Sequence, residues 1–98
     1  MTIAQTIIQQ LGGNKFLAMT GAKSLVDTGE GLQFKLPARL AKSGINCVTI
    51  KLNARDLYDI TYYKTRGLDL KVMGESSDIY ADSLQASFTE ATGLETSL

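Results

Sequence analysis

The chain has 98 residues, a length that fits one domain with a modest hydrophobic core. Ten basic and ten acidic side chains cancel, so the overall charge indicates neither a nucleic-acid partner nor a membrane surface. Histidine is absent and Cys47 is the only cysteine, which excludes an internal disulfide and argues against structural zinc. With no signal-peptide pattern and no apolar run of about 20 residues, we expect one soluble, cytoplasmic domain spanning residues 1–98.

The N-terminal segment from Thr2 to Leu11 has the pattern of an amphipathic helix. Thr2 and Gln5 have the spacing of a capping box, in which each side chain satisfies a free backbone group of the other residue. Apolar residues recur at helical spacing along one stripe: Ile3, Ala4, Ile7, Ile8 and Leu11. The two glycines at 12–13 should end this helix, because glycine readily adopts positive φ.

The next segments favour strands. Lys15 to Thr20 alternates in a way that predicts a strand, which residues 22–26 would continue. Residues 27–31 have the glycine-rich composition of a hairpin turn. Leu32, Phe34 and Leu36 then alternate with polar residues, which is typical of a half-buried strand. Pro37 ends that strand, and residues 37–42 are compatible with one short helical turn.

The central stretch, residues 45–73, contains three runs with a strict period of two, separated by polar turns at residues 53–56 and 64–67. Such a pattern predicts an antiparallel meander with one buried face. The inward side chains are expected to be Val48, Ile50, Leu52, Tyr58, Ile60, Leu68, Leu70 and Val72.

A closing helix is expected near the C-terminus. Ser76, Ser77 and Asp78 are suitable N-caps. Its apolar stripe would be Tyr80, Leu84, Phe88 and Ala91, with Gly93 as the stop. The predicted fold is therefore α+β, a mainly antiparallel meander of four to six strands with the N-terminal and C-terminal helices packed on one face. The other sheet face would stay open.

No combination of residues indicates catalysis, a metal site or a cofactor. Cys47 is expected on the open face, but a cysteine nucleophile needs a general base, and the chain has no histidine. Asp56 and Asp59 fit solvated surface acids better than a catalytic pair. We therefore expect a protein that is not an enzyme.

Charge is distributed unevenly along the chain. Residues 33–71 carry eight basic and three acidic side chains, whereas residues 72–98 carry five acids and no base. The basic residues on or near the sheet are candidates for nucleic-acid contacts: Lys35, Arg39, Lys42, Lys64 and Arg66. Because Asp59 and Asp69 are expected on the same face, cross-strand ion pairing on a solvated sheet is the plainer explanation of the pattern.

The open face also suits a protein partner. Its expected residues form a partly apolar strip, the candidate interaction face: Cys47, Thr49, Lys51, Thr61, Tyr63, Lys71 and Met73. Such a strip can dock another protein or pair with a second copy of the chain as a homodimer. A non-enzymatic protein-binding module is the favoured function, and nucleic-acid binding through the basic open face is the alternative.

Three segments carry a resemblance to a known group of proteins: residues 11–16 (LGGNKF), 19–22 (MTGA) and 88–94 (FTEATGL). With these segments the chain resembles small uncharacterised proteins encoded by bacteriophages and integrated mobile elements. The resemblance implies a bacterial cytoplasm and an accessory genetic element. Because proteins of that origin often modulate host or defence machinery, it also implies a binding role, without indicating the target.

Overall fold

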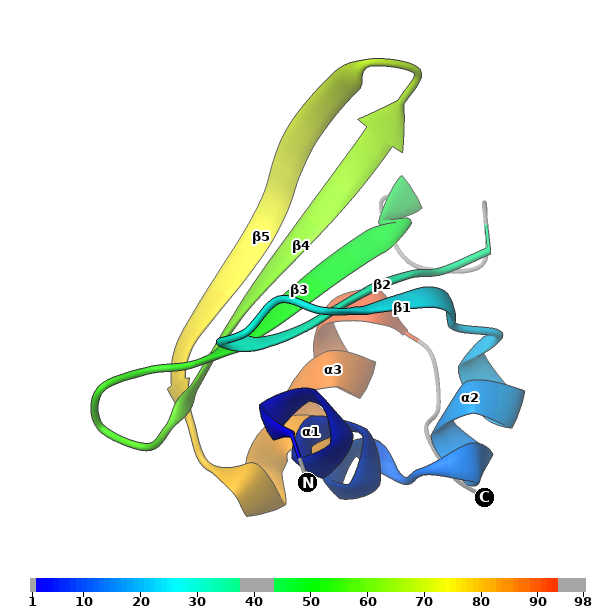
Figure 1. Cartoon of the computed structure of the whole chain (residues 1–98). Helices are drawn as coiled ribbons and strands as arrows, with labels where there is room; N and C mark the ends of the chain where they lie inside the picture. Colours follow the sequence, from blue (N-terminus) through cyan, green and yellow to red (C-terminus); the bar gives the residue numbers. More distant parts are fainter. Residues whose placement is uncertain (1, 38–43, 94–98) are drawn as a thin grey trace.

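The computed structural model describes residues 2–37 and 44–93. It confirms an α+β architecture in which five strands form one antiparallel sheet of order β1-β2-β3-β4-β5. All the described helices lie on one side of this sheet (Figure 1). The elements are α1 (Ile3–Leu11), α2 (Asn14–Thr20), β1 (Lys23–Asp27), β2 (Gly31–Lys35), β3 (Cys47–Leu52), β4 (Tyr58–Arg66), β5 (Asp69–Ile79), the 3₁₀ turn η2 (Ala81–Ser83) and α3 (Leu84–Thr92).

Helix α1 begins and ends as predicted. The Gln5 amide donates to the Thr2 hydroxyl at 3.1 Å, and the Thr2 amide donates to the Gln5 side-chain oxygen at 2.9 Å, which completes the capping box. The helix ends at Gly12, whose φ of 126° a side chain would resist. Ala4, Ile7 and Leu11 are buried, so the apolar stripe faces the sheet as expected.

The strand predicted at Lys15–Thr20 is wrong, because these residues belong to helix α2. Phe16 and Thr20, one helical turn apart, are its buried residues, and the Thr20 hydroxyl donates to the Phe16 carbonyl at 2.7 Å. A short run that is apolar on both faces fits a strand and a buried helix equally well. The predicted continuation is correct in part, since β1 covers Lys23–Asp27.

The hairpin turn between β1 and β2 is confirmed. Gly29 has a φ of 86°, and its amide donates to the Asp27 carboxylate at 2.8 Å. Leu32, Phe34 and Leu36 are buried, as the alternation predicted. The helical turn expected at residues 37–42 falls, apart from Pro37, outside the described residues.

The hydrophobic core lies between the sheet and the helices. At its centre Phe16 contacts Phe34 and Phe88 edge to face, each with ring centroids 5.4 Å apart. The predicted inward residues of β3 and the first half of β4 are confirmed: Val48, Ile50, Tyr58 and Ile60 are buried, and Leu52 packs against them. Leu84 and Phe88 of α3 complete the helix side.

The predicted faces are wrong along the first half of β5. Leu70 is 61% exposed and Val72 is 49% exposed, whereas Met73 packs against the core. A β-bulge causes this reversal: Tyr63 pairs with Val72 and Tyr62 pairs with Gly74, so Met73 is an extra residue without a partner. One extra residue puts the side chains before it on the opposite face from the one that an uninterrupted alternation through Gly74 and Ser76 would give them.

Two further boundaries differ from the prediction. Strand β4 continues to Arg66, so the turn consists of Gly67 and Leu68 and not of the expected residues 64–67. Leu68, expected to face inward, is fully exposed. Ser76, Ser77 and Asp78 lie in β5 and do not cap α3, whose N-cap is Ser83. Tyr80, expected on the apolar stripe, is 65% exposed. Gly93 ends α3 as predicted, with its amide donating to the Thr89 carbonyl at 2.7 Å.

Candidate functional site

The face of the sheet opposite the helices, here called the outer face, is built from cross-strand rows. The register aligns Gln33, Thr49, Thr61 and Glu75 in one row. A neighbouring row contains Lys35, Cys47, Tyr63 and Val72, and Lys51 lies opposite Asp59 on the other side of the first. Side chains directly opposite each other in adjacent strands are in contact range. The outer face is therefore polar across its middle and apolar towards the β4–β5 turn.

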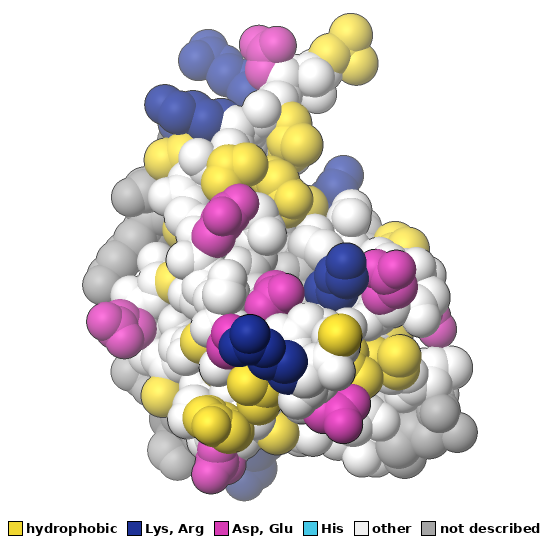
Figure 2. Space-filling model, turned by 90° about the vertical axis from the view of Figure 1, so that its left-hand side faces the viewer, with side chains coloured by type: hydrophobic (Ala, Val, Ile, Leu, Met, Phe, Trp, Pro, Cys, Tyr) yellow, Lys and Arg dark blue, Asp and Glu magenta, His cyan; other side chains and the backbone are white. Residues whose placement is uncertain are grey.

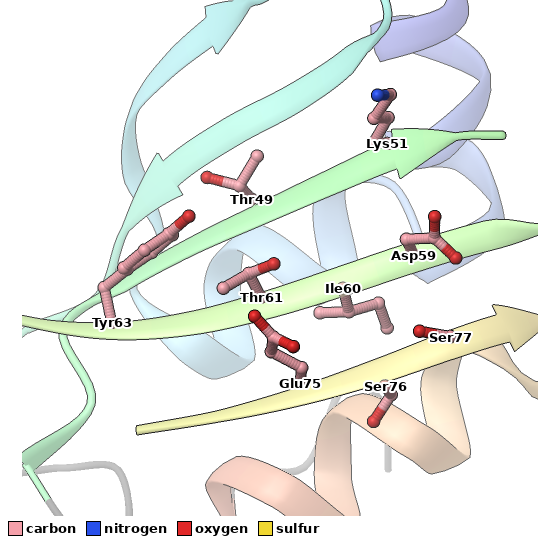
Figure 3. A pocket seen from close by; sticks show the side chains of 9 residues that line it. All are labelled: Thr49, Lys51, Asp59, Ile60, Thr61, Tyr63, Glu75, Ser76 and Ser77. Atoms are coloured by element: carbon pink, nitrogen blue, oxygen red, sulfur yellow. The ribbon is translucent and has the colours of Figure 1, made fainter. Parts of the chain in front are cut away.

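A shallow depression of about 350 Å³ occupies the polar part of this face. Its lining residues come from β3, β4 and β5: Thr49, Lys51, Asp59, Ile60, Thr61, Tyr63, Glu75, Ser76 and Ser77. Figure 3 shows Thr49, Thr61 and Glu75 standing on the same side of the sheet, with Tyr63 at one end and Asp59 at the other. Hydroxyl groups dominate the lining, together with one amine and two carboxylates. The depression can therefore both donate and accept hydrogen bonds.

Two of the three charged groups of the depression, Lys51 and Asp59, are held by neighbouring groups. Lys51 forms an ion pair with Glu30 at 3.2 Å. Asp59 accepts hydrogen bonds from the Asp78 amide and from the Asn53 side chain, both at 3.1 Å. The Asp78 amide contributes most to lowering the pKa of the Asp59 carboxyl, followed by Asn53. These contacts keep Asp59 ionised and join β4 to β5, so the role of Asp59 is structural.

An apolar strip lies beside the depression, towards the β4–β5 turn. It consists of Tyr63, Leu70 and Val72: Tyr63 and Val72 are register partners, and Leu70 is on the same face two residues away. Figure 2, seen from the β5 side, shows hydrophobic side chains gathered below the tip of the molecule. Exposed aliphatic side chains that adjoin one another are typical of contact surfaces.

Four residues of the predicted interaction face do come together on the outer face: Thr49, Lys51, Thr61 and Tyr63. Lys71 and Met73 do not join them. Lys71 pairs with Lys64, which lies on the opposite face from Tyr63, and Met73 turns inward at the bulge. Both errors have one cause. A bulge inserts one extra residue into the strand, and the alternation of apolar and polar residues does not show where.

Cys47 is on the predicted face but is not open to solvent. It is only 4% exposed, between its register partners Lys35 and Tyr63. Burial raises the pKa of the Cys47 thiol, and the nearby Lys35 charge opposes this only in part. A nucleophilic cysteine needs the reverse shift, because the thiolate is the reactive form.

The predicted nucleic-acid contacts are not gathered on the outer face. Lys35 lies there, but Lys64 and Arg66 lie on the opposite face of β4. Arg39 and Lys42 fall outside the described residues. On the outer face the charge is mixed, since Lys51 is matched by Glu30 and Asp59.

Sequence reasoning missed several residues of this face: Asp59, Leu70, Val72, Glu75 and Ser77. Asp59 was interpreted as a solvated surface acid, Leu70 and Val72 were expected to face inward, Ser77 was expected to cap a helix, and Glu75 was given no place. The glycine at position 74, within the strand-like run, was the available signal, because an isolated glycine in a strand often marks a bulge.

Within residues 2–37 and 44–93, no cluster of three or more cysteine, aspartate and glutamate side chains has a geometry that could hold a metal ion. No helix among these residues is long and apolar enough to cross a membrane. No protein-family model, curated protein or solved structure matches the chain. Any assignment of function therefore depends on the geometry of the outer face and of the β4–β5 hairpin.

Proposed function

We propose that this protein is a non-enzymatic interaction module that binds another protein through the outer face of its sheet. The observation that carries the proposal is the apolar strip of Tyr63, Leu70 and Val72, since Leu70 is 61% and Val72 49% exposed. Burying such aliphatic groups in a complex gains free energy in proportion to the area covered.

The surroundings of the strip support the same function. Protein interfaces commonly have an apolar centre and a polar, solvent-accessible rim. The depression beside the strip supplies that rim, with the hydroxyls of Thr49 and Thr61 and the carboxylate of Glu75. The resemblance to small proteins of phages and mobile elements also favours a binding role, with a component of the host machinery as the partner.

Affinity capture from a bacterial extract tests the proposal. The immobilised protein is compared with a Leu70→Ser/Val72→Ser variant and with a Met19→Ser/Tyr80→Ser control, whose substituted residues are also exposed but lie off the strip. We expect a protein that the native chain and the control retain, and that the strip variant binds at least about tenfold more weakly. Capture that is equal for both variants would refute the assignment of the face.

A second copy of the chain is one partner that this face can take. Size-exclusion chromatography with light scattering, over a range of concentrations, distinguishes it from a foreign partner. Dimers that the Leu70→Ser/Val72→Ser variant loses would identify self-association through the strip. A strict monomer at high concentration would leave only a foreign protein as the partner.

A further inference from the structure

The far end of the β4–β5 hairpin, residues 63–72, projects beyond the helices as a two-stranded ribbon (Figure 1). We call it the arm. At its base Asn46 holds Thr65: the Asn46 amide group donates to the Thr65 carbonyl at 2.9 Å and accepts from the Thr65 amide at 2.8 Å. The outer side of the arm carries the apolar strip. Its other side has a different chemistry.

Three basic side chains lie on that other side. The register places Lys64 opposite Lys71, and Arg66 opposite Asp69. All three cations are exposed, and among the described residues none of them has a salt-bridge partner within 4 Å. Two like charges directly opposite each other destabilise a strand pair. The native chain therefore keeps an unfavourable charge arrangement at this point, which an anionic ligand would relieve.

The tip of the arm also departs from the usual composition of a hairpin turn. Gly67, with a φ of 62°, makes the tight turn, and Leu68 beside it is fully exposed at 105%. Two-residue hairpin turns normally carry polar residues with glycine, asparagine or aspartate. Departures from such rules are expected where a site is functional. A bare aliphatic side chain at the end of a basic ribbon is such a departure.

We infer that the arm binds double-stranded DNA, entering a groove with its tip. A groove about 12 Å wide admits a two-stranded β-ribbon. Lys64 and Arg66 are two residues apart, so their side chains are spaced about 6.7 Å along the ribbon and can contact phosphates together with Lys71. Leu68 would then meet the base edges on the floor of that groove, where apolar side chains contact the methyl group of thymine.

The shape of the arm favours a duplex over an acidic protein surface. An acidic surface would satisfy the three cations but would leave no role for an apolar tip on a narrow ribbon. The inference is independent of the proposed protein-binding function, because that function uses Leu70 and Val72 on the opposite side of the arm.

Fluorescence anisotropy with a labelled duplex of about 20 base pairs, roughly two helical turns, tests the inference. Between about 20 and 200 mM salt, three phosphate contacts predict that the logarithm of the binding constant falls with a slope of about −2.7 against the logarithm of salt concentration. A Lys64→Gln/Arg66→Gln/Lys71→Gln variant should bind more weakly and lose most of this slope. Leu68→Ser should weaken binding about tenfold with the slope unchanged.

A matched control removes the same charge from the outer face: Lys23→Gln/Lys35→Gln/Lys51→Gln. It should keep the native slope, because none of these residues belongs to the arm. Circular dichroism confirms that each variant is folded. The inference is overturned by an absence of duplex binding at the lowest salt, or by an equal loss in the arm and control variants. Equal affinity for a single strand would reject a groove site, and equal affinity for a polyglutamate peptide would indicate a protein ligand instead.

Discussion

Strands β4 and β5 have two different environments on either side of the bulge at Met73. In the half nearer the helices, Ile60 and Tyr62 are almost completely buried. In the arm, Leu70 and Val72 are about half exposed or more, although the alternation of apolar and polar residues is as regular. The alternation therefore predicts which neighbouring side chains share a face, while the bulge and the coverage by other elements decide which face is buried.

The two halves are also held differently. The covered half has the core behind it and a polar network at its far end, where Asn53 donates to both Asp59 and Asp78 and Arg55 pairs with Asp78 at 3.2 Å. The arm has its backbone ladder and the contacts of Asn46 with Thr65. Stability is unevenly distributed in folded proteins, and binding elements often come from the less stable part. Here we expect the covered half to determine stability and the arm to be available for binding.

The largest difference in stability is expected between two variants, Phe16→Ala in the core and Leu70→Ala in the arm. Phe16 is fully buried between Phe34 and Phe88, so its removal should lower the free energy of unfolding by about 3–5 kcal/mol. Leu70→Ala should change it by no more than about 0.5 kcal/mol. Urea unfolding followed by circular dichroism measures both values, and losses of similar size would contradict the division.

The boundary between the two halves is tested by substituting two adjacent residues at the bulge, one in each of two variants. Met73→Thr removes a side chain that packs against the core and should cost about 1–2 kcal/mol. Val72→Thr keeps a β-branched side chain at an exposed position and should cost less than about 0.5 kcal/mol. Thermal unfolding of the two variants compares them directly. A greater cost at Val72 would mean that the faces follow the uninterrupted alternation.

Much of the fold could be predicted from the sequence because local signals agree with the packing. The capping box of Thr2 and Gln5, the turn at Gly29 and the stop at Gly93 each satisfy backbone groups within a few residues. The alternation of β2, β3 and early β4 matches the face that the helices cover. Where local and tertiary preferences coincide, the pattern is informative.

The errors have a different origin. Phe16 lies in a segment too short for its period to distinguish helix from strand, so its place at the centre of the core was missed. The bulge at Met73 depends on the pairing with β4, which no local pattern reports. Because that one residue sets the faces of Leu70, Lys71 and Val72, the face on which the candidate residues lie was predicted correctly only on β3 and β4.

Alkaline unfolding offers a smaller test of the covered half. Burial, aided by the Glu90 charge, raises the pKa of the Tyr62 hydroxyl from 10.0 to about 12. An unfolded tyrosine loses its proton first, so folding stability contributed by Tyr62 is complete below about pH 10 and is lost as the pH rises towards 12. Tyr62→Phe should remove this loss, whereas Tyr58, whose pKa is also raised, remains in both proteins.

The measurement compares melting temperatures of the native chain and Tyr62→Phe at about pH 8 and about pH 11. Near neutral pH the variant should be less stable by roughly 0.5–1 kcal/mol, since it lacks the long 3.4 Å hydrogen bond from Tyr62 to the Ser87 carbonyl. Between the two pH values the native chain should lose more stability than the variant. Equal losses would show that Tyr62 ionises as freely in the fold as in the unfolded chain.

The smallest expected effect, a gain in stability, is in the arm. Lys64→Gln removes one of two like charges that face each other across β4 and β5, so it should stabilise the protein by a few tenths of a kcal/mol at low salt. Lys51→Gln is the matched control with the opposite sign, because Lys51 pairs with Glu30 at 3.2 Å and lies opposite Asp59. Both effects should vanish near 1 M salt, where charges are screened beyond about 3 Å. A loss of stability in both variants would mean that Lys64 has a favourable partner in the native chain, and the arm would then carry no unbalanced charge for a ligand to relieve.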